Sequence, residues 1–182
     1  MKKILLIGGG IIVLIIVVAA IVGVGSTSNE PKKVGEASEQ KASNETATES
    51  KVYKVGDQVK LGNAIVTVNK MEFSGGGEFL KPAEGNEWLD LNITVENTGS
   101  SEQYLTTLGQ MFIRDGAGNS YQIASTSKST ENINQMLDGT IIAKSKRTGW
   151  VGFEIKKGAT GLQFQYNDSM WGSGKIIVDL GR

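Results

Sequence analysis

The chain has 182 residues, its 19 lysines and arginines are balanced by 19 aspartates and glutamates, and it contains neither histidine nor cysteine. These absences exclude Ser–His–Asp and Cys–His catalysis, His- or Cys-based zinc sites, disulfides and a lipid-modified cysteine. Balanced charge leaves no basic face for nucleic acid, so we expect no nucleic-acid partner. No cofactor or metal motif is recognisable, and we predict that the protein is not an enzyme.

The N-terminal segment is predicted to enter a membrane. Ile4 to Gly25 contains only Ile, Leu, Val, Ala and Gly, and Lys2 and Lys3 stand immediately before it. At ~1.5 Å per helical residue this stretch would span roughly 33 Å, against a hydrocarbon core of about 30 Å. The lysines favour a cytoplasmic N-terminus, so residues 1–25 are predicted to be a transmembrane helix that anchors an extracytoplasmic C-terminal domain. The alternative is a cleaved signal peptide and a secreted protein, but the segment is long for that role and lacks an Ala-x-Ala site.

Residues 26–51 are predicted to form a disordered linker. They are rich in Ser, Thr, Asn, Glu, Lys and Ala, with almost no bulky apolar side chain. Ordering them would bury too little apolar surface to offset the entropy lost. A coil of this length has an r.m.s. span of roughly 25 to 30 Å, so the next domain would stay close to the outer membrane surface.

Residues 52–182 are predicted to form one β-domain, and its clearest strand is Trp88 to Glu96. There the odd-numbered residues are apolar and the even-numbered ones mostly polar, as in a sheet with one buried face. Between Ala64 and Phe73 the alternation changes parity near Asn69-Lys70, which predicts a β-bulge that turns both halves of the strand inward. Tyr53 to Leu61 has the pattern of a short hairpin around Gly56-Asp57.

The remaining sequence continues the strand pattern. Met111 to Arg114 and Ser120 to Ala124 flank residues 115–119, which are typical of a hairpin loop rather than a calcium loop because Ala117 offers no side-chain oxygen. Further strands are predicted at 151–155, 162–166 and 176–180. The segment 125–144 reads as an irregular connection with one helical turn around 132–137. About seven short strands favour an all-β, immunoglobulin-like two-sheet sandwich, with a small closed barrel as the alternative.

The order of these motifs resembles a known family. Tyr53-Lys54-Val55-Gly56-Asp57 opens the domain, a strand ends in Asn97-Thr98-Gly99, and the Asp115-Gly116 hairpin, Gly149-Trp150-Val151-Gly152-Phe153 and a closing Ile-Val-Asp-Leu strand follow. This order resembles an uncharacterised domain-of-unknown-function family of Gram-positive surface proteins and lipoproteins. That family is similar to the immunoglobulin-like immunoprotective secreted antigen of mycobacteria. The resemblance implies a sandwich fold and an extracytoplasmic location, and it brings no catalytic residues.

Three tryptophans are the candidate partner-binding residues. Trp88 and Trp150 lie on strand faces opposite the apolar residues, where an exposed indole could stack on a sugar ring or anchor a protein partner. Cover by a loop or a neighbouring strand is the alternative for both. Trp171 precedes the last strand, where it either plugs the open end of the sandwich or contributes to a binding surface.

The leading functional hypothesis is a membrane-anchored, extracytoplasmic binding or adhesion module of unknown ligand. Its expected contacts are the lipid bilayer, through Ile4 to Gly25, and a cell-envelope protein or glycan. One alternative is a passive structural component of the cell envelope. Another is a carboxylate-dependent glycan hydrolase, which would need two acids about 5 to 10 Å apart in a cleft.

Overall fold

The computed structural model describes residues 31–35, 51–131, 136–168 and 174–182. The predicted anchor at Ile4 to Gly25 and most of the predicted linker lie outside these residues. Within the described part of the chain, no helix has both the length and the hydropathy that crossing a bilayer requires.

The described residues form strands and one short helix. The early elements are β1 (Lys32–Gly35), β2 (Val52–Lys54), β3 (Gln58–Leu61), β4 (Ala64–Ser74), β5 (Asn86–Asn97), β6 (Gln103–Leu105) and β7 (Met111–Arg114). The later ones are β8 (Ser120–Tyr121), β9 (Ile123–Ala124), α1 (Ser127–Glu131), β10 (Gly139–Ile141), β11 (Lys146–Lys156), β12 (Gln163–Asn167) and β13 (Lys175–Asp179).

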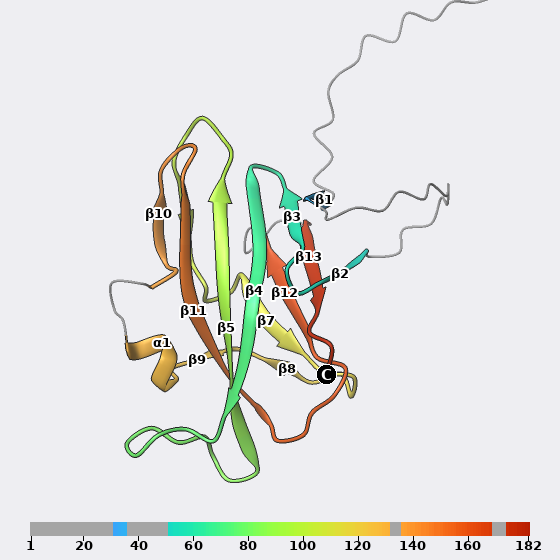
Figure 1. The fold of residues 1–182 in the computed structure, drawn as a ribbon, viewed down its shortest axis with the longest axis vertical. Helices are drawn as coiled ribbons and strands as arrows, with labels where there is room; N and C mark the ends of the chain where they lie inside the picture. The colour runs from blue at the N-terminus through green and yellow to red at the C-terminus, as the bar shows by residue number, and fades with distance from the viewer. Residues whose placement is uncertain (1–30, 36–50, 132–135, 169–173) are drawn as a thin grey trace, which may run out of the picture.

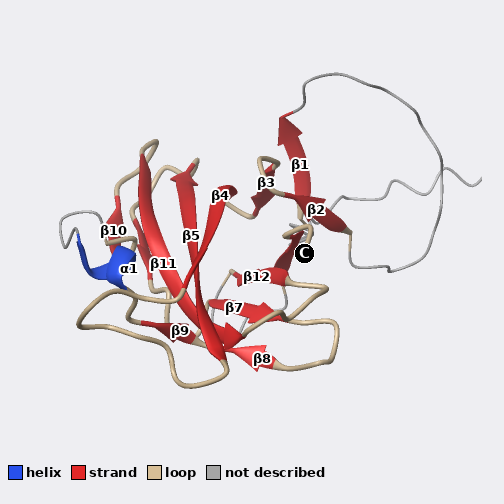
Figure 2. Ribbon diagram, turned by 60° about the horizontal axis from the view of Figure 1, so that its bottom comes forward, coloured by secondary structure: helices blue, strands red, loops and turns tan. Residues whose placement is uncertain are grey.

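Two sheets pack face to face, which confirms the predicted two-sheet β-sandwich (Figure 1). The larger sheet has the order β1-β3-β4-β5-β11-β9, and the smaller sheet has the order β2-β13-β12-β7-β8. Figure 2 shows the smaller sheet lying across the inner face of the long strands β4, β5 and β11. All described strand pairs are antiparallel except β2 with β13.

The core lies between the two sheets and consists of the inward apolar residues of the alternating strands. Leu89, Leu91 and Phe153 of the larger sheet have no exposed surface, and neither do Ile113 and Phe164 of the smaller sheet. Each such side chain stabilises the fold by about 1.5 to 3 kcal/mol through burial. The chain has no disulfide, so packing of this kind holds the layers together.

The β-bulge predicted in β4 is confirmed. The pairing of β4 with β5 is regular from Ala64 to Val68, shifts by one residue, and resumes at Lys70 opposite Asn92. The extra residue is Asn69. It restores the inward direction of Met71 and Phe73, which pack against the core.

The hairpin predicted for Tyr53 to Leu61 is wrong, because the chain changes sheets there. β2 pairs with β13 in the smaller sheet, whereas β3 pairs with β4 in the larger sheet. The turn itself is present, with Gly56 at φ 92° and the Asp57 amide donating to the Lys54 carbonyl. The predicted strand Ser120 to Ala124 divides in the same way, since β8 pairs with β7 and β9 pairs with β11.

Three short elements also differ from the prediction. Residues 32–35 of the predicted disordered linker form β1, which pairs with the edge of β3. A short helix, α1, lies at Ser127–Glu131, whereas most of the helical turn predicted around 132–137 falls at residues 132–135, outside the described part. β6 and β10 pair with each other although their sequences gave too few alternating residues to indicate strands.

Candidate functional site

Trp88 is a buried residue, which agrees with the alternative that a loop covers its indole. Its side chain is only 4% exposed. The β4–β5 connection covers it: a Cβ at Gly76 would lie 3.0 Å from the Trp88 indole nitrogen. This nitrogen has no hydrogen-bond partner among the described residues. Trp88 therefore supports a loop rather than contacting a partner, and Trp171 lies outside the described residues.

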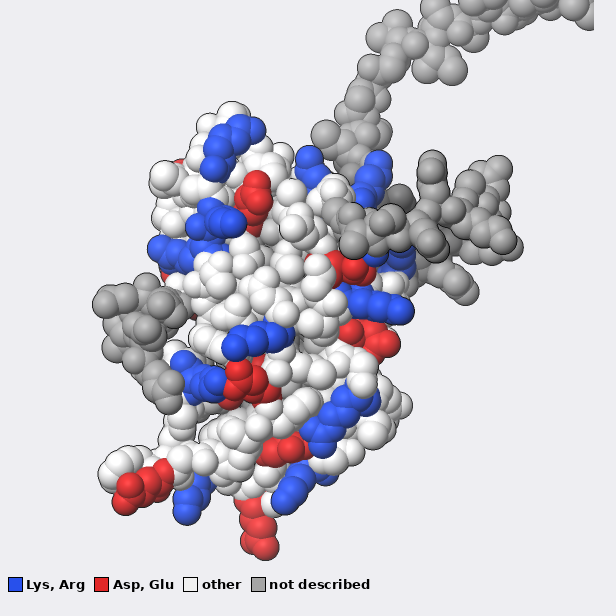
Figure 3. Space-filling view, viewed as in Figure 1, with Lys and Arg blue, Asp and Glu red and all other residues white. Residues whose placement is uncertain are grey.

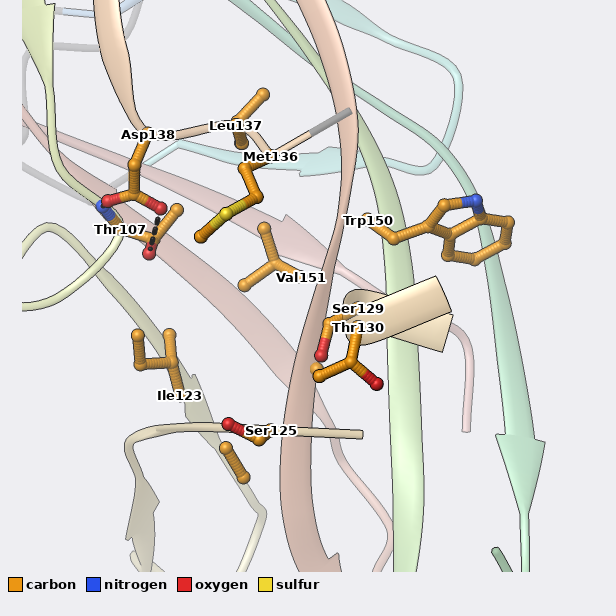
Figure 4. A pocket seen from close by; sticks show the side chains of 12 residues that line it. Thr107, Ile123, Ser125, Ser129, Thr130, Met136, Leu137, Asp138, Trp150 and Val151 are labelled. Atoms are coloured by element: carbon orange, nitrogen blue, oxygen red, sulfur yellow. Dashed lines mark hydrogen bonds between the residues drawn. The ribbon is translucent and has the colours of Figure 1, made fainter. Parts of the chain in front are cut away.

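Trp150 is the candidate that reaches the surface. It stands on β11 and faces away from the core, on the outer side of the larger sheet. Figure 4 shows its ring on the opposite side of β11 from Met136 and Val151. Asn92 is its partner across the strand pair, so Trp150 lies near the middle of the long β11–β5 ladder.

Two lysines lie over the Trp150 ring. The ammonium nitrogen of Lys128, on α1, is 4.6 Å from the ring centroid, and that of Lys70, beside the bulge, is 4.9 Å away. Both lysines contact the carboxylate of Glu72, Lys70 at 3.2 Å. Hydrogen bonds from Lys128 and then Lys70 hold the pKa of Glu72 below its ordinary value. Cation–π attraction and ion pairing thus hold both lysines and Glu72 close to the Trp150 ring.

Uncharged hydrogen-bonding groups lie beside Trp150 on the neighbouring strands, where Asn92 is its cross-strand partner. The Asn69 amide nitrogen donates to Asn92 Oδ1 at 2.9 Å and to Thr94 Oγ1 at 3.0 Å, and the Thr94 and Thr148 hydroxyls lie 2.7 Å apart. The side-chain oxygen of Asn69 and the side-chain nitrogen of Asn92 have no hydrogen bond within the described residues. We call this surface, made of Trp150, Asn69, Asn92, Thr94 and Thr148, the Trp150 face.

The space-filling view shows the setting of this face. Figure 3 looks onto the outer side of the larger sheet, where uncharged atoms predominate over β4, β5 and β11 and charges of both signs lie among them. The sequence indicated Trp150 but missed the amides beside it. Strand parity alone would have placed Asn92, Thr94 and Thr148 on its side, and the predicted bulge would have added Asn69.

A buried carboxylate borders the site. Asp90 points to the outer side of β5 yet is only 2% exposed, because Thr126 and α1 cover it. The Thr126 hydroxyl donates to Asp90 Oδ1 and also accepts from the Ser129 amide at 3.1 Å, which caps the first turn of α1. This contact ties the start of α1 to β5, beside β11, and so helps to position Lys128 over Trp150.

A small pocket of about 200 Å³ lies between α1 and β11, and Trp150 lines it together with Val151 and Gly152 (Figure 4). Its wall is mainly apolar and includes Ile123, Met136 and Val151. At its rim Asp138 accepts hydrogen bonds from the Thr107 amide at 2.7 Å and the Thr107 hydroxyl at 2.8 Å. These bonds hold the Asp138 carboxylate against Thr107.

A second pocket, of about 320 Å³, opens between the sheets near the β3–β4 turn. Residues from β6, β12 and the neighbouring turns surround it, among them Tyr104, Gln110, Tyr166 and Asp168. Burial, and secondly the charge of Asp168, raise the pKa of Tyr166 to about 12. Among the described residues, no group of three or more acidic side chains could hold a metal ion.

Comparison with known proteins gives the fold but no activity. No curated protein matches the sequence. The crystal structure of the YjhA protein of Bacillus subtilis is similar, with a TM-score of 0.58 and 24% identity over 71% of this chain and 99% of that one. A β-sandwich protein of Clostridium difficile has a TM-score of 0.47 and 16% identity, over 74% and 99%. MPT63, a secreted protein of Mycobacterium tuberculosis, has a TM-score of 0.47 and 14% identity, over 73% and 99%.

The family expected from the motif order is confirmed. A domain of unknown function, DUF4352, matches residues 53–176, which include most of β2, all of β3 to β12 and the start of β13. The matched segment holds the whole Trp150 face and most of both sheets, and it begins after β1. The chain therefore belongs to the DUF4352 family.

Proposed function

We propose that this protein is an extracytoplasmic binding module rather than an enzyme, held at the membrane by Ile4 to Gly25, with the Trp150 face as its recognition surface. The observation that carries the proposal is the placing of a partly exposed indole beside amide groups that keep free hydrogen-bonding capacity. Aromatic and amide side chains on one rigid sheet can hold a planar or ring-shaped ligand with little loss of side-chain entropy. A cell-envelope glycan or protein is the expected partner.

The recognition surface is tested with the full-length protein in nanodiscs. Purified cell-wall polysaccharide and detergent-solubilised envelope protein are titrated separately, and saturable binding to one of them is expected. Trp150→Ala should weaken that binding at least tenfold, whereas Phe79→Ala, which removes an aromatic side chain 95% exposed elsewhere, should leave it unchanged. Absence of saturable binding, or equal binding by Trp150→Ala, would contradict the proposal.

The membrane attachment is tested separately. Intact-mass measurement of the mature protein should show the complete N-terminal segment, and the product should sediment with membranes. Externally added protease should cleave the C-terminal domain in cells stripped of their wall while cytoplasmic markers survive. Loss of about the first 25 residues would replace the anchor by a cleaved signal peptide and leave the recognition surface untouched.

A passive structural role is the second candidate, and the two lysines over Trp150 favour it. Their stems and ammonium groups cover part of the ring, as in a surface whose tryptophan stabilises the fold through cation–π contacts. In that case Trp150→Ala would lower the free energy of unfolding without changing any binding. Measuring stability and binding on the same variant distinguishes the two functions.

A further inference from the structure

The pocket near the β3–β4 turn contains polar groups that the fold leaves without partners. Tyr166 is only 4% exposed, lines the pocket, and its hydroxyl makes no hydrogen bond within the described residues. Asp168 also lines it, and its Oδ1 is buried with no hydrogen-bond partner. None of the ion pairs among the described residues includes Asp168. Leaving a buried carboxylate oxygen unpaired costs stability, so a ligand that donates a hydrogen bond to it would be favoured.

The backbone around Asp168 is fixed by Gln110, which is 5% exposed. Its amide nitrogen donates to the carbonyl of Asp168 at 3.1 Å, and its Oε1 accepts from the Thr106 amide at 2.9 Å. The Asp168 amide donates to the Gly174 carbonyl at 3.1 Å. These bonds hold the Asp168 backbone in place, and no donor among the described residues reaches the buried carboxylate oxygen, so an external donor would have an acceptor here.

The chemistry of the pocket selects the kind of donor. The carboxylate brings a negative charge, while the Tyr166 phenol stays protonated at neutral pH and adds a neutral acceptor. A calcium or magnesium ion would need about six oxygen ligands, more than these two side chains offer. An ammonium group has three donors and no acceptor, which suits a carboxylate and a phenol oxygen that line one pocket. Leu105 and Ile141 in the wall suit an aliphatic chain, and Tyr104 at the mouth is 73% exposed.

We propose that this pocket binds a primary alkylammonium group of the kind that ends a lysine side chain, with Asp168 and Tyr166 as its acceptors. The ammonium donates to the carboxylate and to the phenol oxygen, and the methylene chain lies beside Leu105 and Ile141. Tyr104 closes the mouth over the chain. The site is separate from the Trp150 face, and its occupation does not depend on the ligand proposed there.

The test uses the ¹⁵N-labelled full-length protein in detergent micelles. Nα-acetyl-L-lysine methylamide is titrated, and its Nε-acetylated form, which is uncharged, serves as the control probe. We expect saturable amide shifts confined to the pocket residues for the first probe and none for the second. Shifts that gather elsewhere, or equal binding of the two probes, would overturn the proposal.

Variants assign the acceptors. Asp168→Asn should raise the apparent Kd at least tenfold, and Tyr166→Phe should raise it three- to tenfold. Asp179→Asn makes the same charge change at an exposed carboxylate on β13 and should leave the Kd unchanged. Unfolding curves show whether each variant is folded, and Tyr166→Phe keeps the ring that fills the core. Wild-type affinity in folded Asp168→Asn would refute the site.

Discussion

At the scale of single residues, Gly152 determines how closely α1 can approach the larger sheet. A Cβ at this position would lie 2.3 Å from Thr126 Cγ2, 2.6 Å from Thr126 Oγ1 and 2.9 Å from the Ala124 carbonyl oxygen. The absence of a side chain here lets the Thr126 hydroxyl reach Asp90. The glycine is thus required by packing and not by a turn.

We expect Gly152→Ala to lower the free energy of unfolding by about 1 to 3 kcal/mol, the usual cost of overfilling a packed site. The displaced Thr126 would also uncover Asp90, so α1 should lose hydrogen-exchange protection first. Urea denaturation measures the change. Gly75→Ala is the matched control, because a Cβ there meets nothing within 4 Å. Equal unfolding midpoints for the two variants would show that the site can relax.

Asp115 closes the β7–β8 loop. Its carboxylate accepts from the Asn119 side chain at 2.7 Å, the Tyr121 hydroxyl at 2.7 Å, and the amides of Asn119 and Ala117. These bonds, with Asn119 first and Tyr121 second, lower its pKa to about 2 from an ordinary 3.8. Four donors thus meet at one carboxylate in the hairpin loop, and the pairing of β7 with β8 confirms the hairpin that the sequence predicted.

The lowered pKa of Asp115 determines how its contribution to folding stability changes with pH. Asp115 contributes stability that is complete above its ordinary pKa and is lost as pH falls through the pKa of the folded state. In Tyr121→Phe one of the donors is gone, so the pKa of Asp115 should rise toward its ordinary value. NMR titration of the side-chain carboxyl carbon measures it. Phe112→Tyr, on β7, serves as a control. An unchanged titration midpoint of Asp115 in Tyr121→Phe would refute the role of the Tyr121 hydroxyl.

At the scale of elements, β1 stands out because it comes from outside the family domain. It lies along the edge of β3, where Lys33 Nζ is 2.9 Å from Asp57 Oδ1 and the Tyr53 hydroxyl donates to the Pro31 carbonyl at 2.8 Å. Burial alone would raise the pKa of Asp57, but hydrogen bonds from Lys33 and the Lys54 amide lower it overall. The strand also covers an edge that could otherwise pair with another chain.

Reversing the charge of Lys33 should detach this strand. Lys33→Glu replaces an attraction to Asp57 by a repulsion, so we expect amide exchange in β1 to accelerate about tenfold or more, while β12 and β13 remain protected. Hydrogen–deuterium exchange measures this on the full chain. Lys32→Glu is the matched control, since Lys32 faces Lys60 across the pair and the change removes a repulsion. Equal exchange in both variants would contradict the role of the ion pair.

The wild-type strand should also detach in acid. The lowered pKa of Asp57 means that its contribution to docking is complete above 3.8 and is lost as pH falls through the lower value of the docked state. Asp57→Asn should remove this pH dependence.

The elements that the sequence predicted correctly are those whose fold follows from local alternation. β5, β11 and the bulge of β4 are long enough for parity to be counted, and the core faces follow from it. The errors arise where the chain changes sheets, at Gly56 and at Gln122, because a period of two looks the same whichever sheet the strand joins. β1 was missed because its pairing depends on β3 and not on its own composition.

At the scale of the whole molecule, the sandwich determines which candidate residues become accessible. Trp88 and Trp150 have the same parity on neighbouring strands, and only the loop at 75–85 and helix α1 give them different environments. Neither the loop at 75–85 nor α1 has a periodic sequence. The alternation of apolar residues therefore could not show which of the two indoles is exposed. The pocket at Asp168 joins residues from distant strands, and its unpaired groups become visible only in the assembled fold.

The docked β1 also sets the distance between the domain and the predicted anchor. With residues 32–35 on β3, only residues 26–31 separate the folded part from Gly25, a span of at most about 20 Å. Without the strand, residues 26–51 could extend to roughly 90 Å. Figure 1 shows β1 at one end of the molecule and the β4–β5 connection at the opposite end. An anchored domain should therefore stand with β3 near the bilayer and Phe79 away from it.

Because the chain has no cysteine, a fluorophore can be attached at one chosen site of the full-length protein in nanodiscs. Quenching by lipids with a spin-labelled headgroup should be several-fold stronger for a label on Lys60→Cys, in β3, than for one on Phe79→Cys. Adding Lys33→Glu should reduce this difference, because the domain then moves on the longer tether, while adding Lys32→Glu should preserve it. Equal quenching at both sites in the otherwise unaltered chain would show that β1 does not orient the domain.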